Sequence, residues 1–284
     1  MTLILPFGCV AKPKKILPTP AVQWINLKLT IGLIHTTFHQ KDYFLEMTYC
    51  FDLDETICYS PSTVPRDYSL AQPYLSVVQQ VNDLYDSGHT ITIFTARGGT
   101  SGKDWHDITT SQLKSWALKY HTLIDKGKPH FDLFVDDKAI NAHEWRMQNN
   151  ARITGFVASS FDLLHAGHCL YLKDAKRVCD YLVAALQTDP TLDRPHKKMP
   201  LQTLAERRAQ LEGSKYVDEI IEYSTEEDLS NILKKIRPDI RVLGSDCKER
   251  DWMTGEEYCS QVYYHSRDHN WSSTELIERI KNSR

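Results

Sequence analysis

Two acidic residues stand two positions apart at the end of an apolar run in the segment FDLDETIC, residues 51–58. They are Asp52 and Asp54, and Thr56 follows them closely. A carboxylate can attack a phosphoryl group and form an aspartyl phosphate, while a second carboxylate nearby protonates the leaving oxygen and later activates water. Taken alone, the segment is more typical of a helix cap, so a catalytic interpretation depends on the residues that the fold brings beside it.

Hydrophobic periodicity predicts the elements that position these carboxylates. Residues 48–54, 90–98 and 130–137 are predicted strands, and residues 75–88 and 110–124 are predicted amphipathic helices. Strands that alternate with helices at this interval indicate an α/β fold with a parallel sheet, whose ligands lie outside the carboxyl ends of the strands. All three predicted strands end in polar residues, which are Asp52 with Asp54, Thr95 with Arg97, and Asp136 with Asp137.

The polar strand ends suit phosphoryl transfer assisted by a metal ion. Carboxylates that converge from several strand ends repel one another unless a hard cation lies among them, and Mg²⁺ prefers such oxygen ligands. The hydroxyl of Thr95 and the ammonium of Lys128 would then bind the phosphoryl oxygens. Either piece alone, DLDET or DD, is more typical of a cap or a solvated turn.

Four segments in order resemble the motifs of the haloacid dehalogenase (HAD) superfamily of phosphohydrolases: FDLDETIC, TIFTARG, DKGKP and FVDDKAIN. The resemblance covers roughly residues 47–150. It implies that Asp52 is the nucleophile, Asp54 the general acid and base, Thr95 the phosphoryl-binding hydroxyl and Lys128 the charge-stabilising lysine, with Lys126 and Lys138 as competitors for that last role. The acids that it assigns to the Mg²⁺ site are Asp52, Asp54, Asp136 and Asp137.

A second α/β unit begins near Ala151. Residues 152–186 predict a strand, a loop that contains His165 and His168, an amphipathic helix and another strand. Only Ala166 and Gly167 separate the two histidines, so a phosphate can approach the backbone at the start of the helix, where the helix dipole favours negative charge. Paired histidines in this setting favour anion binding over simple packing.

The segment SSFDLLHAGHCLYLKDA resembles the signature of the cytidylyltransferase-like nucleotidyltransferases, and three later segments extend the resemblance: residues 198–221, 237–246 and 267–277. The resemblance is strongest to glycerol-3-phosphate cytidylyltransferases and to the nucleotidyltransferase domain of ADP-heptose synthesis. It implies catalytic roles for His165 and His168. It also implies nucleotide or substrate contacts from Ser160, Asp189, Lys198, Arg207, Asp246, Arg267, Ser272, Ser273 and Thr274.

The sequence therefore predicts two Rossmann-like parallel-sheet domains, HAD-like at residues 47–150 and nucleotidyltransferase-like at residues 151–284. The expected enzyme removes a phosphate in its first domain. In its second it transfers CMP from CTP, or a nucleotidyl group from another NTP, to a small phosphorylated polyol or sugar, making a precursor of surface polysaccharide. Two alternatives stay open. One is an ADP-heptose-type adenylyltransferase with a sugar-bisphosphate phosphatase, and the other makes one domain a non-catalytic binding module.

Composition narrows the setting of these reactions. The chain has 284 residues and a formal net charge of −3, with no basic run long enough to bind nucleic acid, which also argues against an aminoacyl-tRNA synthetase. Its seven cysteines form no Cys-x-x-Cys pair, which suits the reducing cytoplasm. Residues 1–46 contain prolines that interrupt each apolar stretch, so we expect a dispensable extension and no membrane span, with Met47 as the functional start. A homodimer is expected from the family resemblance.

Overall fold

The computed structural model describes residues 46–283 except 62, 64, 130–132, 134–135, 196, 251–252 and 270. Residues 45–284 form one compact unit. The predicted N-terminal extension, residues 1–46, lies outside the described residues apart from Glu46. Within the described part of the chain, no helix is both long and apolar enough to cross a membrane.

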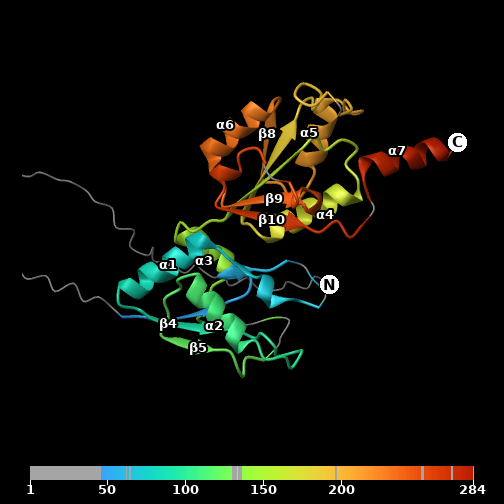
Figure 1. Cartoon of the computed structure of the whole chain (residues 1–284). Coiled ribbons are helices and arrows are strands. Elements are labelled where there is room, and N and C mark those ends of the chain that lie inside the picture. Colours follow the sequence, from blue (N-terminus) through green and yellow to red (C-terminus); the bar gives the residue numbers. More distant parts are fainter. Residues whose placement is uncertain are drawn as a thin grey trace, which may run out of the picture. The chain divides into compact units, whose positions relative to one another are not determined.

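The first half contains a three-stranded parallel sheet with the order β1-β4-β5 (Figure 1). Ile91 and Ile93 alternate with half-buried residues along β4 and are fully buried, as expected for strand positions that point into a core. The elements of this half are β1 (Thr48–Asp52), β2 (Cys58–Tyr59), η1 (Tyr68–Leu70), β3 (Gln72–Pro73), α1 (Leu75–Asp86), β4 (Thr90–Phe94), α2 (His106–Ser115), β5 (Thr122–Ile124) and α3 (Ala142–Gln148). Strands β2 and β3 form a separate antiparallel pair.

The prediction of one helix over residues 110–124 is wrong at both ends. Helix α2 begins earlier and stops at Ser115, and residues 122–124 form β5 beside β4. Ala117 adopts the left-handed conformation, with φ of 53°, and this reverses the chain so that the β-branched Thr122 and Ile124 can join the sheet. The predicted strand at residues 130–137 falls mostly outside the described residues.

The second half contains a five-stranded parallel sheet with the order β10-β9-β6-β7-β8. Its elements are β6 (Thr154–Ser159), α4 (Ala166–Arg177), β7 (Tyr181–Gln187), α5 (Leu204–Glu212), β8 (Glu219–Tyr223), α6 (Glu226–Ile236), β9 (Ile240–Gly244), η2 (Ser245–Cys247), η3 (Glu256–Tyr258), β10 (Gln261–His265) and α7 (Ser273–Asn282) (Figure 1). The chain leaves central β6 toward β7 on one side and returns to β9 on the other. This reversal is a topological switch point, where open α/β sheets bind ligands. The α/β prediction with parallel sheets is confirmed.

Apolar and ionic contacts join the two halves. A single buried cluster contains Phe51 of β1 and also Leu182 of β7. Helix α3 contributes Trp145, whose ring meets Phe51 edge-on at 5.1 Å, and Arg146, whose guanidinium donates to the buried carboxylate of Asp180 at 2.6 and 2.8 Å. A hydrogen-bonded buried ion pair of this kind fixes one arrangement of the groups around it.

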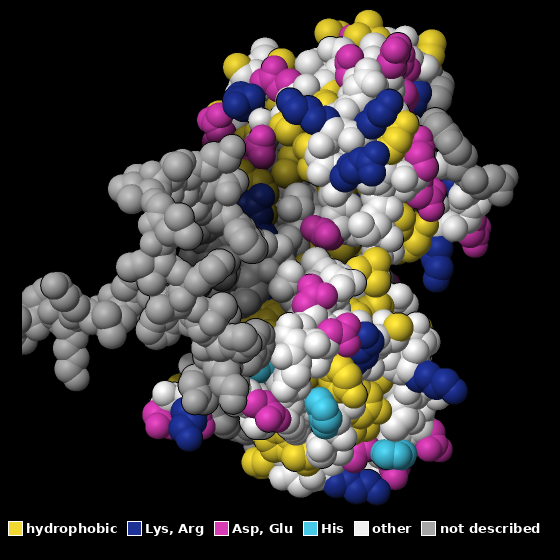
Figure 2. Space-filling model, turned by 90° about the vertical axis from the view of Figure 1, so that its left-hand side faces the viewer, with side chains coloured by type: hydrophobic (Ala, Val, Ile, Leu, Met, Phe, Trp, Pro, Cys, Tyr) yellow, Lys and Arg dark blue, Asp and Glu magenta, His cyan; other side chains and the backbone are white. Residues whose placement is uncertain are grey.

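The surface carries mixed charge. On the face drawn in Figure 2, the described Lys and Arg side chains are interspersed with Asp and Glu and form no continuous basic stripe. Binding to a polyanionic nucleic acid depends on such a stripe. The expectation that nucleic acid is not a partner stays a prediction.

Candidate active sites

The first candidate site lies at the carboxyl edge of the three-stranded sheet. Parallel pairing aligns Asp52 with Phe94, and Phe94 with Ile124. Thr95 follows Phe94 directly, and the loop after Ile124 leads to Lys128. The structure therefore brings together Asp52, Thr95 and Lys128 at one sheet edge, because parallel strands end at the same edge.

Asp52 is paired with a nearly buried lysine. Lys128 Nζ lies 2.6 Å from Asp52 Oδ1 and donates a second hydrogen bond to the carbonyl of Phe94 at 3.0 Å. Burial raises the pKa of the Asp52 carboxyl, while the hydrogen bond and positive charge of Lys128 act in the opposite direction. The side chain of Asp52 remains 44% exposed, so an incoming phosphoryl group can reach it. Of the three candidate lysines, Lys128 is the one that contacts the predicted nucleophile.

Asp54 is held by an arginine whose role the sequence did not reveal. Arg97 donates to the Asp54 carboxylate through Nε at 3.0 Å and Nη2 at 2.8 Å, and the Thr95 hydroxyl lies 3.4 Å from the same group. Burial alone would lower the pKa of Arg97, but the hydrogen bond and charge of Asp54 outweigh it and raise that pKa. The spacing of Thr95 and Arg97 in the segment TARG is the sequence signal that could have predicted this contact, because residues two apart on an extended chain point to the same side.

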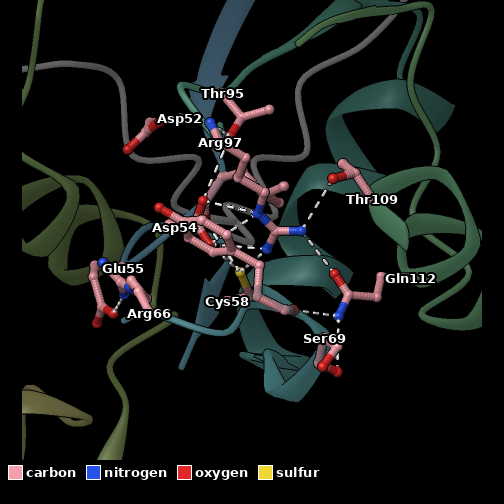
Figure 3. Close-up of polar contacts among 12 residues, drawn as sticks. Asp52, Asp54, Glu55, Cys58, Arg66, Ser69, Thr95, Arg97, Thr109 and Gln112 are labelled. Atoms are coloured by element: carbon pink, nitrogen blue, oxygen red, sulfur yellow. Dashed lines mark hydrogen bonds and ion pairs between the residues drawn. The ribbon is translucent and has the colours of Figure 1, made fainter. Parts of the chain in front are cut away.

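Arg97 is itself fixed from several directions. In Figure 3 its guanidinium lies between Asp54 on one side and Thr109 and Gln112 on the other, and Nη1 donates to these two side chains at 3.2 and 2.7 Å. Gln112 in turn donates to the Tyr68 carbonyl at 2.8 Å, and the Arg97 guanidinium lies 4.9 Å from the Tyr68 ring centroid. A side chain with this many partners has one orientation, so Asp54 is preorganised.

The predicted Mg²⁺ ligands are not assembled among the described residues. All four are carboxylates, which suit Mg²⁺ chemically. Asp52 and Asp54 are occupied by Lys128 and Arg97, whereas Asp136 is exposed and accepts a hydrogen bond from the backbone of Lys138. Asp137 is exposed as well. In the described part of the chain no group of three or more His, Cys, Asp or Glu side chains could hold a metal ion. Magnesium binding stays a prediction.

Glu55, between Asp54 and Thr56, connects the first site to the second half. It adopts φ of 63°, a conformation that is costly for a residue with a side chain. Its carboxylate pairs with Arg66 and lies 3.3 Å from Arg177 of α4. Arg177 also donates to the Ser60 carbonyl at 2.9 Å. The strained residue thus carries an ion pair that crosses between the halves.

The second candidate site is built on the loop between β6 and α4, at the switch point of the five-stranded sheet. His165 caps α4, and its Nδ1 accepts a hydrogen bond from the backbone of Gly167 at 3.1 Å. The His165 and His168 rings stack with their centroids 4.0 Å apart. Because the Gly167 and His165 groups satisfy each other, the helix start is rigid before any ligand arrives.

His168 is neutral at physiological pH. Burial, then the neighbouring His165 and Arg267, lower its pKa to about 3. Its Nδ1 is buried and has no hydrogen-bond partner among the described residues. Burial followed by the charges of His269 and Arg267 also lowers the pKa of His165. A neutral imidazole keeps one N–H donor, so both rings can donate to an oxyanion without carrying charge.

Residues 271–274, near the C-terminus, pack against this loop. A side chain on Gly167 would place its Cβ 2.6 Å from the carbonyl of Trp271, so a glycine is needed for the close approach. The Ser273 hydroxyl donates to the carbonyl of Asp162 at 3.1 Å. Ser272 caps α7 by accepting from Glu275 N at 3.1 Å, and Thr274 is exposed. The predicted C-terminal residues therefore lie beside the histidine loop.

Arg267 and Asp246 meet at the end of β9. Arg267 Nη1 lies 3.3 Å from Asp246 Oδ1, and both side chains are about half exposed. A Cβ on Gly244 would collide with both side chains, which explains the glycine at this strand end. The arrangement leaves an accessible guanidinium close enough to the histidines to lower the pKa of both.

The remaining predicted contacts differ in their surroundings. Arg207 is 2% exposed and donates to four backbone carbonyls, those of Ser160, Gln187, Thr188 and Gln202. This set of partners makes Arg207 a residue that positions the strand ends, and its predicted phosphate contact stays a prediction. Asp189 caps its own turn through Thr191, whose hydrogen bonds lower the Asp189 pKa. Lys198 is exposed and available to a ligand.

Comparison with known proteins finds a family match in the second half of the chain. Residues 156–279 match the family described as "Cytidylyltransferase-like" and form a domain of that type. Over 130 residues the chain is 32% identical to "Bifunctional protein HldE" of Helicobacter hepaticus, covering 45% of this chain and 27% of the relative. Over 190 residues it is 30% identical to the protein of that name from Shewanella sp. strain ANA-3, covering 66% of this chain and 39% of the relative. The chain spans well under half the length of these relatives.

The chain is also similar to one solved structure, that of the lipopolysaccharide core biosynthesis protein from Thermoplasma volcanium. It is 27% identical, with a TM-score of 0.31, and the match covers 46% of this chain and 88% of that one. A second, pantoate-beta-alanine (pantothenate synthetase) from Thermus thermophilus, is 14% identical with a TM-score of 0.32, covering 44% of this chain and 64% of that one.

Proposed function

We propose that the chain is a bifunctional enzyme whose first half hydrolyses phosphomonoesters and whose second half transfers a nucleotidyl group. The observation that carries the transferase is the HAGH loop, with two neutral histidines at the switch point of a cytidylyltransferase-like domain. The geometry at the first sheet edge supports the phosphatase, since a lysine-paired carboxylate stands beside a second carboxylate that an arginine orients.

In the proposed phosphatase, an oxygen of Asp52 forms a bond to phosphorus and the bond to the leaving alkoxide breaks. Asp54 delivers a proton to that alkoxide and later takes one from the water that hydrolyses the aspartyl phosphate. Lys128 and Thr95 stabilise the charge on the phosphoryl oxygens. Asp52, Asp54, Asp136 and Asp137 would hold Mg²⁺, which would supply further charge neutralisation when bound.

In the proposed transferase, a phosphate oxygen of the acceptor attacks the α-phosphorus of an NTP, and pyrophosphate leaves as the α–β bond breaks. His165 and His168 donate N–H groups to the oxyanion, and Arg267 and Lys198 supply positive charge. The hydroxyls of Ser272, Ser273 and Thr274 lie on the segment that packs against the histidine loop. Arg207 keeps the carboxyl ends of β6 and β7 in place.

The finer assignment is CTP as nucleotide and a small phosphorylated polyol or sugar as acceptor, in a cytoplasmic homodimer that makes a polysaccharide precursor. Resemblance to glycerol-3-phosphate cytidylyltransferases supports CTP. The order of reactions that fits both halves is removal of one phosphate first, followed by coupling of the remaining phosphate.

A screen of the four NTPs against phosphorylated polyols and sugars, with pyrophosphate release as the signal, tests the transferase. We expect release with CTP, and release with ATP alone would replace the assignment by the adenylyl alternative. Phosphate release by the same preparation, with and without a chelator, tests the phosphatase and its Mg²⁺. Activity that resists chelation would remove the metal from the proposal.

A further inference from the structure

Asp162 lies in the loop between β6 and α4, the histidine loop, three residues before His165. In the proposed transferase this loop receives the phosphates of a nucleotide, and a carboxylate repels other anions. The charge of Asp162 reaches the site, since burial lowers the pKa of His168 to about 3 and the negative charge of Asp162 acts against this decrease. An acid in this place therefore needs a purpose other than contact with phosphate.

The Asp162 carboxylate binds the backbone of another loop with both of its oxygens. Oδ2 accepts a hydrogen bond from Leu201 N at 3.0 Å, and Oδ1 accepts one from Gln202 N at 3.0 Å. These two donors stand near the end of the loop that joins β7 to α5, the β7–α5 loop. A carboxylate offers two equivalent acceptor oxygens, whereas the amide of an asparagine offers one. The contact therefore requires an acid.

Two further hydrogen bonds bring three segments together at Asp162. Leu163 N donates to Gln202 Oε1 at 2.7 Å, which strengthens the connection to the β7–α5 loop. The hydroxyl of Ser273, at the start of α7, donates to the carbonyl of Asp162 at 3.1 Å. The histidine loop, the β7–α5 loop and the start of α7 thus meet at one residue. Each of these segments carries a proposed contact of the transferase.

The backbone on both sides of Asp162 is strained. Phe161 and Leu163 each have φ of 49°, in the left-handed region that is costly for residues with side chains. Phe161 is fully buried, and its ring centroid lies 5.5 Å from that of His168. Such a conformation persists where the surrounding contacts hold it. The hydrogen bonds of Asp162 and Leu163 therefore fix this turn relative to His168.

The position of Lys198 depends on the same contacts. Lys198 is exposed and stands three residues before Leu201. Arg194 holds the loop on the β7 side by donating to Gln187 Oε1 at 2.7 Å, and Asp162 holds it on the α5 side. Without the Asp162 carboxylate, the loop would lose the two anchoring hydrogen bonds closest in sequence to Lys198 on that side. The loop would then have to be ordered when the nucleotide binds, which weakens binding.

We propose that Asp162 is a positioning residue that holds the β7–α5 loop against the histidine loop and thereby places Lys198 beside the nucleotide. The inference rests on the proposed transferase and adds the residue on which its Lys198 contact depends. Asp162 acts through the backbone of residues 201 and 202 and makes no contact with the substrate.

The test is a double-mutant cycle of Asp162→Ala and Lys198→Met in the full-length chain. Pyrophosphate release is the readout, with CTP and glycerol 3-phosphate as the first probes. We expect each single variant to raise the KM for the nucleotide about tenfold and to change kcat less than about threefold, because a binding contact is lost. The double variant should also stay near about tenfold, far below the product of the two effects, since Asp162 acts through Lys198.

Cleavage by trypsin follows the loop directly. The bonds after Lys197 and Lys198 lie in the β7–α5 loop, and both lysines are exposed. Asp162→Ala should be cut at these bonds about tenfold faster than the wild type, because a loop that opens more often is cleaved more often. Asp162→Asn keeps one acceptor oxygen, so its KM and cleavage rate should lie between those of the wild type and Asp162→Ala. This variant carries the same test where Asp162→Ala does not fold.

Asp239→Ala is the matched control. Asp239 also binds the backbone of a distant segment, accepting from Thr154 N at 2.8 Å, but it stands at the amino end of the same sheet, beside the start of β6 and β9. Its substitution removes a comparable contact away from the histidine loop. We expect the KM for the nucleotide and the cleavage rate in the β7–α5 loop to be unchanged.

The outcomes separate this inference from the function on which it rests. Additive losses in the double variant, or a KM or cleavage rate that Asp162→Ala leaves unchanged, overturn the inference. Pyrophosphate release by the wild type that depends on His168 leaves the transferase standing in that case. No pyrophosphate release by the wild type with any pair of NTP and acceptor overturns both.

Discussion

The two candidate sites handle charge in opposite ways. At the first sheet edge each carboxylate has its own cation, Lys128 for Asp52 and Arg97 for Asp54. At the switch point of the second sheet, His168 is neutral and its Nδ1 has no partner among the described residues. In the proposed reactions, the first site supplies a negative nucleophile, whereas the second receives a ligand that brings negative charge with it. The two proposed reactions on phosphates thus differ in the charges that their sites must provide.

The largest effect is expected from Asp52→Asn. The amide cannot form the acyl phosphate, so phosphate release should fall at least about a thousandfold. The measurement is steady-state hydrolysis of p-nitrophenyl phosphate. Retention of more than a tenth of the activity would show that Asp52 is not the nucleophile.

A somewhat smaller effect is expected from His168→Asn in the second site. Loss of an oxyanion donor costs about a hundredfold to a thousandfold in turnover, and the smaller side chain keeps a polar group in the buried position. Pyrophosphate release is the readout. His121→Asn is a suitable comparison, because His121 lies in the first half, where its ring accepts from the backbone N–H of Ile91 and stacks on Tyr85. Equal losses in the two variants would argue for a purely structural role.

Arg97→Met removes the cation that pairs with Asp54 in the first site. It leaves the Asp54 carboxylate, whose side chain is 15% exposed, without its cation, so we expect about 3 kcal/mol less stability and about a tenfold to hundredfold slower phosphate release. Urea unfolding and hydrolysis rates measure the two effects. Arg66→Met removes a partly exposed ion pair with Glu55 and should cost less than about 1 kcal/mol.

Arg97 is a positioning residue, and Arg97→Lys separates position from charge. It should recover most of the stability but little of the rate, because an ammonium lacks the two-pronged geometry that orients Asp54. Full recovery of the rate by lysine would contradict the proposed orienting role.

The smallest effect concerns acid stability of the second site. Burial lowers the pKa of folded His168 from 6.5 to about 3, so between these values the unfolded chain binds more protons than the folded one. The stabilisation is complete above about pH 6.5 and declines as the pH falls toward 3, by about 1–2 kcal/mol on reaching pH 5. Between pH 6.5 and pH 5, the urea midpoint of unfolding should therefore fall more for the wild type than for His168→Asn. Parallel curves would contradict a neutral buried His168.

Some of the site residues could be predicted from the sequence, and others could not. Strand periodicity and motif order located Asp52, Thr95 and the histidine loop, because strand ends in a parallel sheet determine which residues meet. The role of Arg97 could not be predicted in this way, since residue type does not show which partners a guanidinium meets. Arg207 illustrates the same limit, because the family resemblance implied a nucleotide or substrate contact but did not show that its guanidinium also donates to backbone carbonyls.

Local conformation was a second source of error. The helical prediction for residues 110–124 counted periodic apolar residues and did not anticipate the left-handed Ala117, which ends the helical segment before β5. Pairing with β4 outweighs the modest helix propensity of this short segment. The Glu55 conformation was equally hidden, because its ion pair with Arg177 joins residues far apart in sequence.

The central claim is that one chain carries two separate chemistries, and a side-by-side assay of wild type, Asp52→Asn and His168→Asn tests it most directly. Each preparation is assayed for release of inorganic phosphate and of pyrophosphate, with melting temperatures measured to confirm folding. We predict that Asp52→Asn loses only phosphate release and His168→Asn loses only pyrophosphate release. Folded variants that lose both activities together, or neither, would contradict the claim.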